Sequence, residues 1–153
     1  MKRSLTFALM GMLLLSACGT GGGEVIEVHD PWARPAITGE NSAIYLLLHN
    51  HTANDDELMS ASSDVAASVE LHESKMVEGS DMMEMTPVAS VPLPADGEVE
   101  FKPGGLHIML FGLKRDLKVG DQFDVTLTFK SGLTLKVTVP VMENMDGTHM
   151  DGM

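Results

Sequence analysis

The stretch "FDVTLTFKSGLTLKVTV", Phe123 to Val139, alternates apolar and polar residues on both sides of a short turn. The apolar members of its two halves are Phe123, Val125, Leu127 and Phe129, followed by Leu133, Leu135, Val137 and Val139. Side chains of a strand point alternately to the two faces of a sheet, so this period of two predicts an antiparallel β-hairpin with one buried face.

Shorter stretches of the same kind recur along the chain and are separated by Gly, Pro, Asn and Asp. They occupy residues 24–29, 43–49, 68–73, 98–102 and 106–111. Only residues 57–63 could hold a short helix. The pattern therefore predicts an all-β domain with little helix, either a Greek-key β-sandwich or a small barrel. The 153 residues, 44% of them hydrophobic, suffice for one compact domain.

The amino terminus has the pattern of an export signal. Residues 2–16 join a basic start to an apolar run shorter than the roughly 20 residues that span a bilayer. The following Ala17-Cys18 resembles a bacterial lipobox, which implies cleavage before Cys18 and lipid attachment to it; the alternative is an ordinary signal peptide with an incidental cysteine. We expect a lipid-anchored protein of the bacterial cell envelope, on its periplasmic or extracellular face.

These boundaries divide the chain into four parts. We expect a lipoprotein signal peptide at 1–17, a lipidated flexible linker at 18–23, a β-sandwich domain at 24–141 and a disordered Met/His-rich tail at 142–153.

Composition excludes several classes of function. Cys18 is the only cysteine, so the mature domain has no thiol for a thiolate zinc site, an iron–sulfur cluster, a cysteine nucleophile or a blue-copper centre. A formal net charge of −12 argues against nucleic acid as a partner, because phosphate binding requires clustered positive charge. No nucleophile, carboxylate pair or phosphate loop indicates an enzyme.

Histidine and methionine instead occupy unusual places. His72 in "SVELHES" and His107 in "PGGLHIML" alternate with apolar residues, which places each imidazole on the face opposite the apolar side chains and predicts that it is exposed. Polar segments hold most of the candidate thioethers, namely Met76, Met82, Met83 and Met85 in one loop and Met142, Met145, Met150 and Met153 beside His149 in the tail.

A thioether is a soft neutral donor that suits Cu(I), and imidazole suits both oxidation states of copper. A mixed set of imidazoles and thioethers therefore favours copper, preferably Cu(I). Taken alone, Met109 could equally be an edge methionine that packs under a loop, and His72 could be a surface histidine. Only the joint pattern favours a metal site.

The order and spacing of four of these residues, His72, Met85, His107 and Met109, resemble the H-x10-M-x21-H-x-M signature of PCuAC-type periplasmic copper chaperones. Further similarity covers residues 24–140, including "DPWARP", "ASVELHES" and "PGGLHIML". The first spacing is two residues longer than in the signature. Met83 would restore it but leaves twenty-three residues before His107, so Met85 is the preferred ligand and Met83 the alternative.

The resemblance implies a cupredoxin-like β-sandwich in which His72, Met85, His107 and Met109 hold one Cu(I) at an exposed edge. It also implies delivery of copper for assembly of the dinuclear copper centre of cytochrome c oxidase, with that copper-centre subunit and a Sco-like protein as partners. Additional metal ligands could come from Met83, Met142, Met145, His149, Met150 and Met153, and the tail could bind Cu(II).

Two alternatives stay open. The first is a periplasmic copper buffer or resistance protein, which the Met/His-rich tail would suit. The second is an enzyme or electron carrier of the cupredoxin type, which the missing cysteine opposes.

Overall fold

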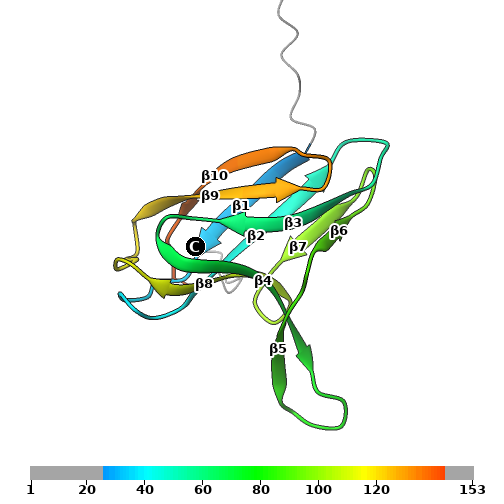
Figure 1. The fold of residues 1–153 in the computed structure, drawn as a ribbon. Helices are drawn as coiled ribbons and strands as arrows, with labels where there is room; N and C mark the ends of the chain where they lie inside the picture. Colours follow the sequence, from blue (N-terminus) through cyan, green and yellow to red (C-terminus); the bar gives the residue numbers. More distant parts are fainter. Residues whose placement is uncertain (1–25, 144–153) are drawn as a thin grey trace, which may run out of the picture.

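The computed structural model of the protein describes residues 26–143, which form ten strands in two sheets (Figure 1). The six-stranded sheet has the order β1 (Ile26–Ala33), β2 (Ser42–Asn50), β7 (Glu98–Phe101), β8 (Leu106–Leu113), β4 (Ala66–Met76) and β5 (Met83–Pro87). The four-stranded sheet has the order β10 (Thr134–Pro140), β9 (Gln122–Phe129), β3 (Asp56–Ser62) and β6 (Val91–Leu93). Residues 26–143 contain no helix that is long and apolar enough to cross a membrane.

The core lies between the inner faces of the two sheets. Its fully buried side chains include Ile44 and Leu48 of β2, Ile108 of β8, and Val125 and Leu127 of β9. Burying such side chains is the main stabilising contribution in a domain of this size. The prediction of an all-β cupredoxin-like sandwich is therefore confirmed.

The hairpin predicted from the 123–139 stretch is formed by β9 and β10. Val137 lies opposite Val125, and Leu135 lies opposite Leu127, so the apolar residues of both strands share one face. Gly132 in the connecting turn has φ of 90°, a conformation that side chains with a Cβ adopt only with strain.

The short helix considered for 57–63 is wrong, because β3 covers nearly the same residues. Leu58 and Ala61 are both buried in the core, although their spacing of three does not fit a regular strand. A shift of register against β9 between Leu58 and Ser60 explains this spacing. A β-bulge adds a residue to one strand and so breaks the period of two that reveals a strand in the sequence.

A second difference concerns the loop expected at 76–84. Residues 83–87 form the edge strand β5, which pairs with the end of β4 in an antiparallel hairpin, with Met76 opposite Met83. All five residues of β5 are exposed. This β4–β5 hairpin projects from the body of the sandwich, at the bottom of Figure 1.

Candidate metal centre

His72 and His107 meet across two neighbouring strands. The register of β4 and β8 places the two residues directly opposite each other, and their ring centroids are 5.8 Å apart. Residues opposite each other in an antiparallel pair share a face of the sheet. The sequence prediction that both imidazoles lie on the face away from the core is confirmed by this register.

The prediction that this face exposes them is wrong. His72 is 9% exposed and His107 is 4% exposed. Aromatic rings cover them: Phe111 lies 5.5 Å from the His72 ring, and Tyr45 lies 6.4 Å from the His107 ring, between centroids. Alternation alone identifies the face of a strand but not what covers that face.

Each imidazole uses one nitrogen in a hydrogen bond and leaves the other free. His72 Nε2 lies 3.0 Å from a carboxylate oxygen of Glu70, and His107 Nδ1 lies 3.0 Å from the carbonyl oxygen of Gly105. Both partners are acceptors, so each bonded ring nitrogen carries the proton. His72 Nδ1 and His107 Nε2 are buried and have no hydrogen-bond partner within residues 26–143.

Two unpaired lone pairs on buried imidazoles are the clearest sign of a metal site. A buried polar atom without a partner costs about 1–3 kcal/mol, which a metal ion would offset. A second-sphere carboxylate or carbonyl that fixes the tautomer is typical of histidine ligands. Glu70 is not among the residues predicted from the sequence, although its position two residues before His72 on the same strand could have indicated this role.

Two of the predicted thioether ligands lie near the His107 ring. Met109 follows His107 by two residues on β8 and packs against a cluster that contains Trp32 and Tyr45. Met85 on β5 is 59% exposed. Met85, His107 and Met109 line one small cavity of about 190 Å³, so the structure brings three of the four predicted ligands to one cavity and His72 to its neighbour His107.

Met83 lies on the same face as Met85, two residues earlier on β5. Its terminal methyl group is 4.0 Å from the point where a Cβ on Gly104 would lie, and Gly104 also lines the cavity. Met83 is 49% exposed. Met83 therefore lies near a residue that lines the cavity, but of the two methionines only Met85 lines the cavity itself.

Of the remaining predicted residues, only Met142 lies within the described range 26–143. Met142 packs against the Trp32–Tyr45 cluster, as Met109 does, and its amide donates a 3.0 Å hydrogen bond to the carbonyl of Ala33. The first residue of the predicted tail therefore lies against the body of the domain. The remaining predictions, Cys18, Met145, His149, Met150 and Met153, lie outside the described residues.

Tyr45 and Arg34 also line this cavity, and its lining contains no carboxylate. Burial raises the pKa of the Tyr45 phenol, which therefore stays protonated at neutral pH. The guanidinium carbon of Arg34 lies 5.4 Å from the centre of the Tyr45 ring. A lining that holds one cation and no carboxylate favours a monovalent soft ion over a divalent one.

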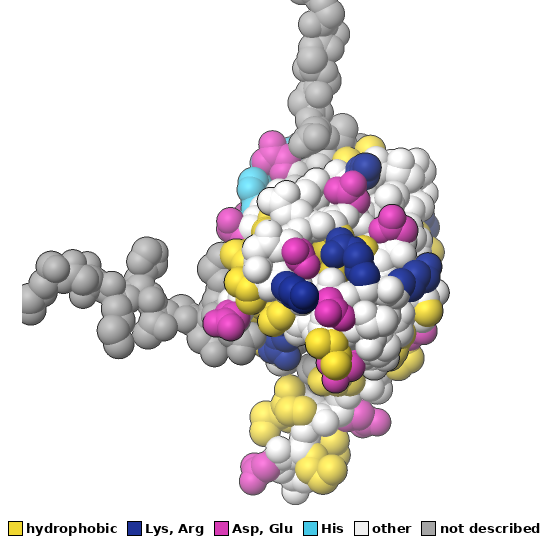
Figure 2. Space-filling model, turned by 90° about the vertical axis from the view of Figure 1, so that its left-hand side faces the viewer, with side chains coloured by type: hydrophobic (Ala, Val, Ile, Leu, Met, Phe, Trp, Pro, Cys, Tyr) yellow, Lys and Arg dark blue, Asp and Glu magenta, His cyan; other side chains and the backbone are white. Residues whose placement is uncertain are grey.

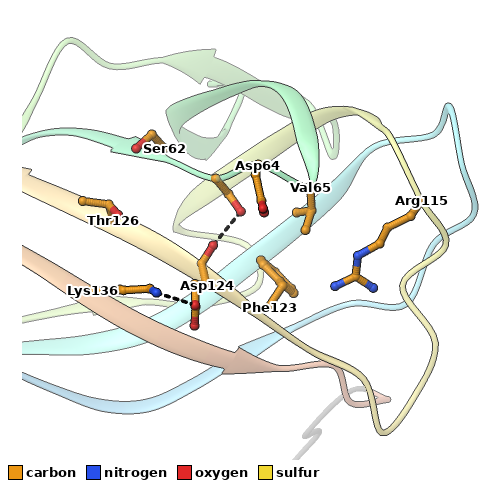
Figure 3. A pocket seen from close by; sticks show the side chains of 9 residues that line it. Ser62, Asp64, Val65, Arg115, Phe123, Asp124, Thr126 and Lys136 are labelled. Carbon is orange, nitrogen blue, oxygen red and sulfur yellow. Dashed lines mark hydrogen bonds and ion pairs between the residues drawn. The ribbon is translucent and has the colours of Figure 1, made fainter.

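A wider groove of about 480 Å³ lies elsewhere, along the four-stranded sheet (Figure 3). Lys136 Nζ is 2.8 Å from a carboxylate oxygen of Asp124, and hydrogen bonds from Lys136 and Thr138 lower the pKa of Asp124. Neither imidazole nor thioether lines this groove. Lys136 and Asp124 are paired with each other, and the groove lacks the soft donors that Cu(I) prefers.

Known proteins resemble this chain in sequence and in fold. Residues 26–141 match a family described as "Putative lipoprotein LpqE-like", and the chain belongs to this family. A protein of Leifsonia xyli subsp. xyli named "Putative lipoprotein Lxx21020" is 33% identical over 118 residues, 77% of this chain and 70% of that protein. The uncharacterised protein RP573 of Rickettsia prowazekii is 36% identical over 117 residues, 72% of this chain and 63% of that protein.

Solved structures of similar fold include two that hold copper. The copper-bound PCuAC domain from PmoF2 is 24% identical, with a TM-score of 0.64, and the match covers 78% of this chain and 94% of that domain. Cu(I)-DR1885 from Deinococcus radiodurans is 31% identical, with a TM-score of 0.58, and the match covers 86% of this chain and 89% of that one. The resemblance to the PCuAC-type copper chaperone family is thereby confirmed.

Proposed function

We propose that this protein is an extracytoplasmic Cu(I)-binding metallochaperone, held at the cell envelope by lipid on Cys18. The observation that carries the proposal is the pair of unpaired, buried nitrogens, His72 Nδ1 and His107 Nε2, on directly opposite residues. The copper in two structures of similar fold and the lipoprotein names of the family support it.

Four side chains would bind the ion in this proposal: His72, Met85, His107 and Met109. Two neutral imidazoles and two thioethers match the softness of Cu(I). None of the four ligands is a thiolate or carboxylate, so none adds a negative charge beside the singly charged ion. Thioethers compete poorly for Zn(II), so the same set discriminates against that ion.

The different exposure of these ligands suits the transfer of copper to another protein. The imidazoles are buried and oriented by hydrogen bonds, whereas Met85 is 59% exposed on the projecting hairpin. An approaching acceptor can reach Met85 without unfolding the core. Figure 2 shows hydrophobic side chains on the surface of the hairpin, at the bottom of the view, and the exposed methionines Met76, Met82, Met83 and Met85 belong to this segment.

The choice between the two hairpin methionines gives a direct test. We expect Met85→Leu to weaken Cu(I) binding by at least about tenfold, because losing a ligand should cost no less than losing a second-sphere partner. Leucine has nearly the same volume and the site is exposed, so the free energy of unfolding should change by less than about 1 kcal/mol. Competition with a coloured Cu(I) chelator measures the affinity.

Met83→Leu is the matched control, since it makes the same chemical change two residues away on the same strand. We expect a smaller loss of affinity than in Met85→Leu. A larger loss in Met83→Leu would show that Met83 is the ligand and that the two extra residues lie elsewhere in the hairpin.

The proposed destination of the copper is the dinuclear copper centre of cytochrome c oxidase, alone or with a Sco-like protein. We expect the Cu(I)-loaded protein to fill the apo copper-centre domain of the oxidase when the two are mixed with any reductant the centre requires. The visible spectrum of the filled centre reports the transfer. A control with the Met85→Leu variant should show whether the hairpin methionine sets the rate.

A copper buffer or resistance protein is the second candidate. The exposed methionines of the β4–β5 hairpin favour it, because they could hold further Cu(I) ions weakly. If the loaded protein retains its copper beside the apo acceptor but lowers free copper at several equivalents per chain, the buffer is correct and the delivery role is not.

A further inference from the structure

Three histidines that the copper signature does not include lie close together where the first half of β1 pairs with the end of β2. They are His29 on β1, His49 on β2 and His51 just after β2. One ring nitrogen from each lies within 4.8 Å of the others. The ring centroids of His49 and His51 are 3.7 Å apart, and those of His29 and His49 are 6.4 Å apart.

Strand register places this three-histidine cluster on the outer face of the six-stranded sheet. Glu27 lies opposite His49, and His29 lies opposite Leu47, whereas the neighbouring Leu48 is completely buried in the core. Alternation therefore turns Glu27, His29 and His49 away from the core together.

The turn that carries His51 is held firmly. Asn50 is 1% exposed, and its side-chain amide donates hydrogen bonds to the carbonyls of Asn54 and Pro94 at 2.8 Å and 3.1 Å. Its side-chain oxygen accepts from the amide of Thr52 at 3.0 Å. Because this anchor fixes the backbone between them, His49 and His51 stay close together without a metal.

Carboxylates complete the cluster. One oxygen of Glu27 lies 3.0 Å from His51 Nε2 and 3.3 Å from His29 Nε2, and a carboxylate oxygen of Glu98 lies 3.6 Å from His49 Nδ1. The hydrogen bond with His51 lowers the pKa of Glu27, which keeps that carboxylate ionised. Figure 2 shows histidine beside acidic side chains on the upper left of the surface.

We propose that His29, His49 and His51, with Glu27 as the fourth ligand, form a second metal site that binds Cu(II). Three imidazole nitrogens and one carboxylate oxygen are borderline-to-hard donors, and the cluster contains no thioether. Among divalent ions such sites bind Cu(II) most tightly, ahead of Zn(II). A hydrogen-bonded surface cluster without a metal role is the competing explanation.

The three-histidine site is open to solvent and separate from the proposed Cu(I) site. The side chains of His29 and His51 are 44% and 42% exposed, so an ion can enter without opening the fold. Tyr45, which borders the first centre, and His49 are four residues apart on the same face of β2, which is about 13 Å. The two sites share no ligand, so this inference stands or fails independently of the proposed function.

The experiment uses the full chain with His72→Ala, His107→Ala and His149→Ala, which removes every other imidazole. Titration with Cu(II), followed by electron paramagnetic resonance, should show one bound ion with nitrogen hyperfine structure. Adding His51→Ala should lower the Cu(II) affinity at least tenfold. His51 is half-exposed and outside the strands, so this variant should fold normally, which circular dichroism checks.

Glu27→Gln and Glu100→Gln form a matched pair. Both remove one carboxylate charge from the outer face, but Glu100 lies beside Lys102 and not beside the histidines. Only Glu27→Gln should weaken Cu(II) binding. Unchanged affinity in the His51→Ala chain, equal losses in the two glutamine variants, or displacement of Cu(II) by an equimolar amount of Zn(II) would each overturn the copper assignment.

Discussion

His72→Ala combined with His107→Ala is expected to lower Cu(I) affinity by at least about 100-fold and to remove most of its dependence on pH. In the parent, protons compete with the ion for the free nitrogens of both imidazoles, so affinity should fall as the pH is lowered from about 7.5 to about 5. The remaining thioethers of Met85 and Met109 do not titrate in this range. The double variant should therefore bind weakly and almost equally across it.

Cu(I) affinity is measured against a chelator at several pH values, with less than one equivalent of copper so that the tightest site reports. His51→Ala is the matched control, since it removes an imidazole that is not among the proposed Cu(I) ligands. It should leave the affinity and the pH curve unchanged. If the double variant binds as tightly as the parent and follows the same curve, the two buried histidines are not ligands.

The second large effect concerns the core residue between two predicted ligands. Ile108 on β8 is 0% exposed and points inward, whereas its neighbours His107 and Met109 point outward. Ile108→Ala should lower the free energy of unfolding by about 2–5 kcal/mol, because it leaves a cavity in the packed core. The thermal midpoint should fall by roughly 10 °C.

Thermal unfolding with and without Cu(I) checks this expectation. Ile37→Ala makes the same chemical change at a residue that is 60% exposed, and it should alter the free energy of unfolding by no more than about 0.5 kcal/mol. Copper should raise the midpoint of all three proteins, since the ligands are intact. A change below 1 kcal/mol in Ile108→Ala would mean that β8 is not packed as described.

The parts of the fold that the sequence predicts well are those in which one face of a strand is buried and the other is wet. The β9–β10 hairpin is of this kind, with Val125 and Leu127 inside and Thr126 between them on the other face. The strand β3 is not, because its bulge near Leu58 breaks the alternation. The edge strand β5 buries none of its residues and so leaves no apolar pattern to read.

The sequence likewise predicts some features of the candidate site and not others. Period and spacing indicate which residues share a face, and so they group His72, His107 and Met109. They carry no information on packing between distant segments, which is why the burial of both imidazoles under Tyr45 and Phe111 could not be predicted. The three-histidine cluster depends on the register of β1 against β2, which local sequence does not specify.

The pairing of His72 opposite His107 determines the order in which the protein folds and binds copper. The two residues are far apart in the chain and meet only when β4 pairs with β8 in the native register. A slip of one residue would turn His107 into the interior and bring Ile108 out, because side chains alternate with a period of two. The proposed Cu(I) site therefore forms only after this long-range pairing is complete. Folding would then precede copper loading, and copper bound at this site would report a correctly paired sheet.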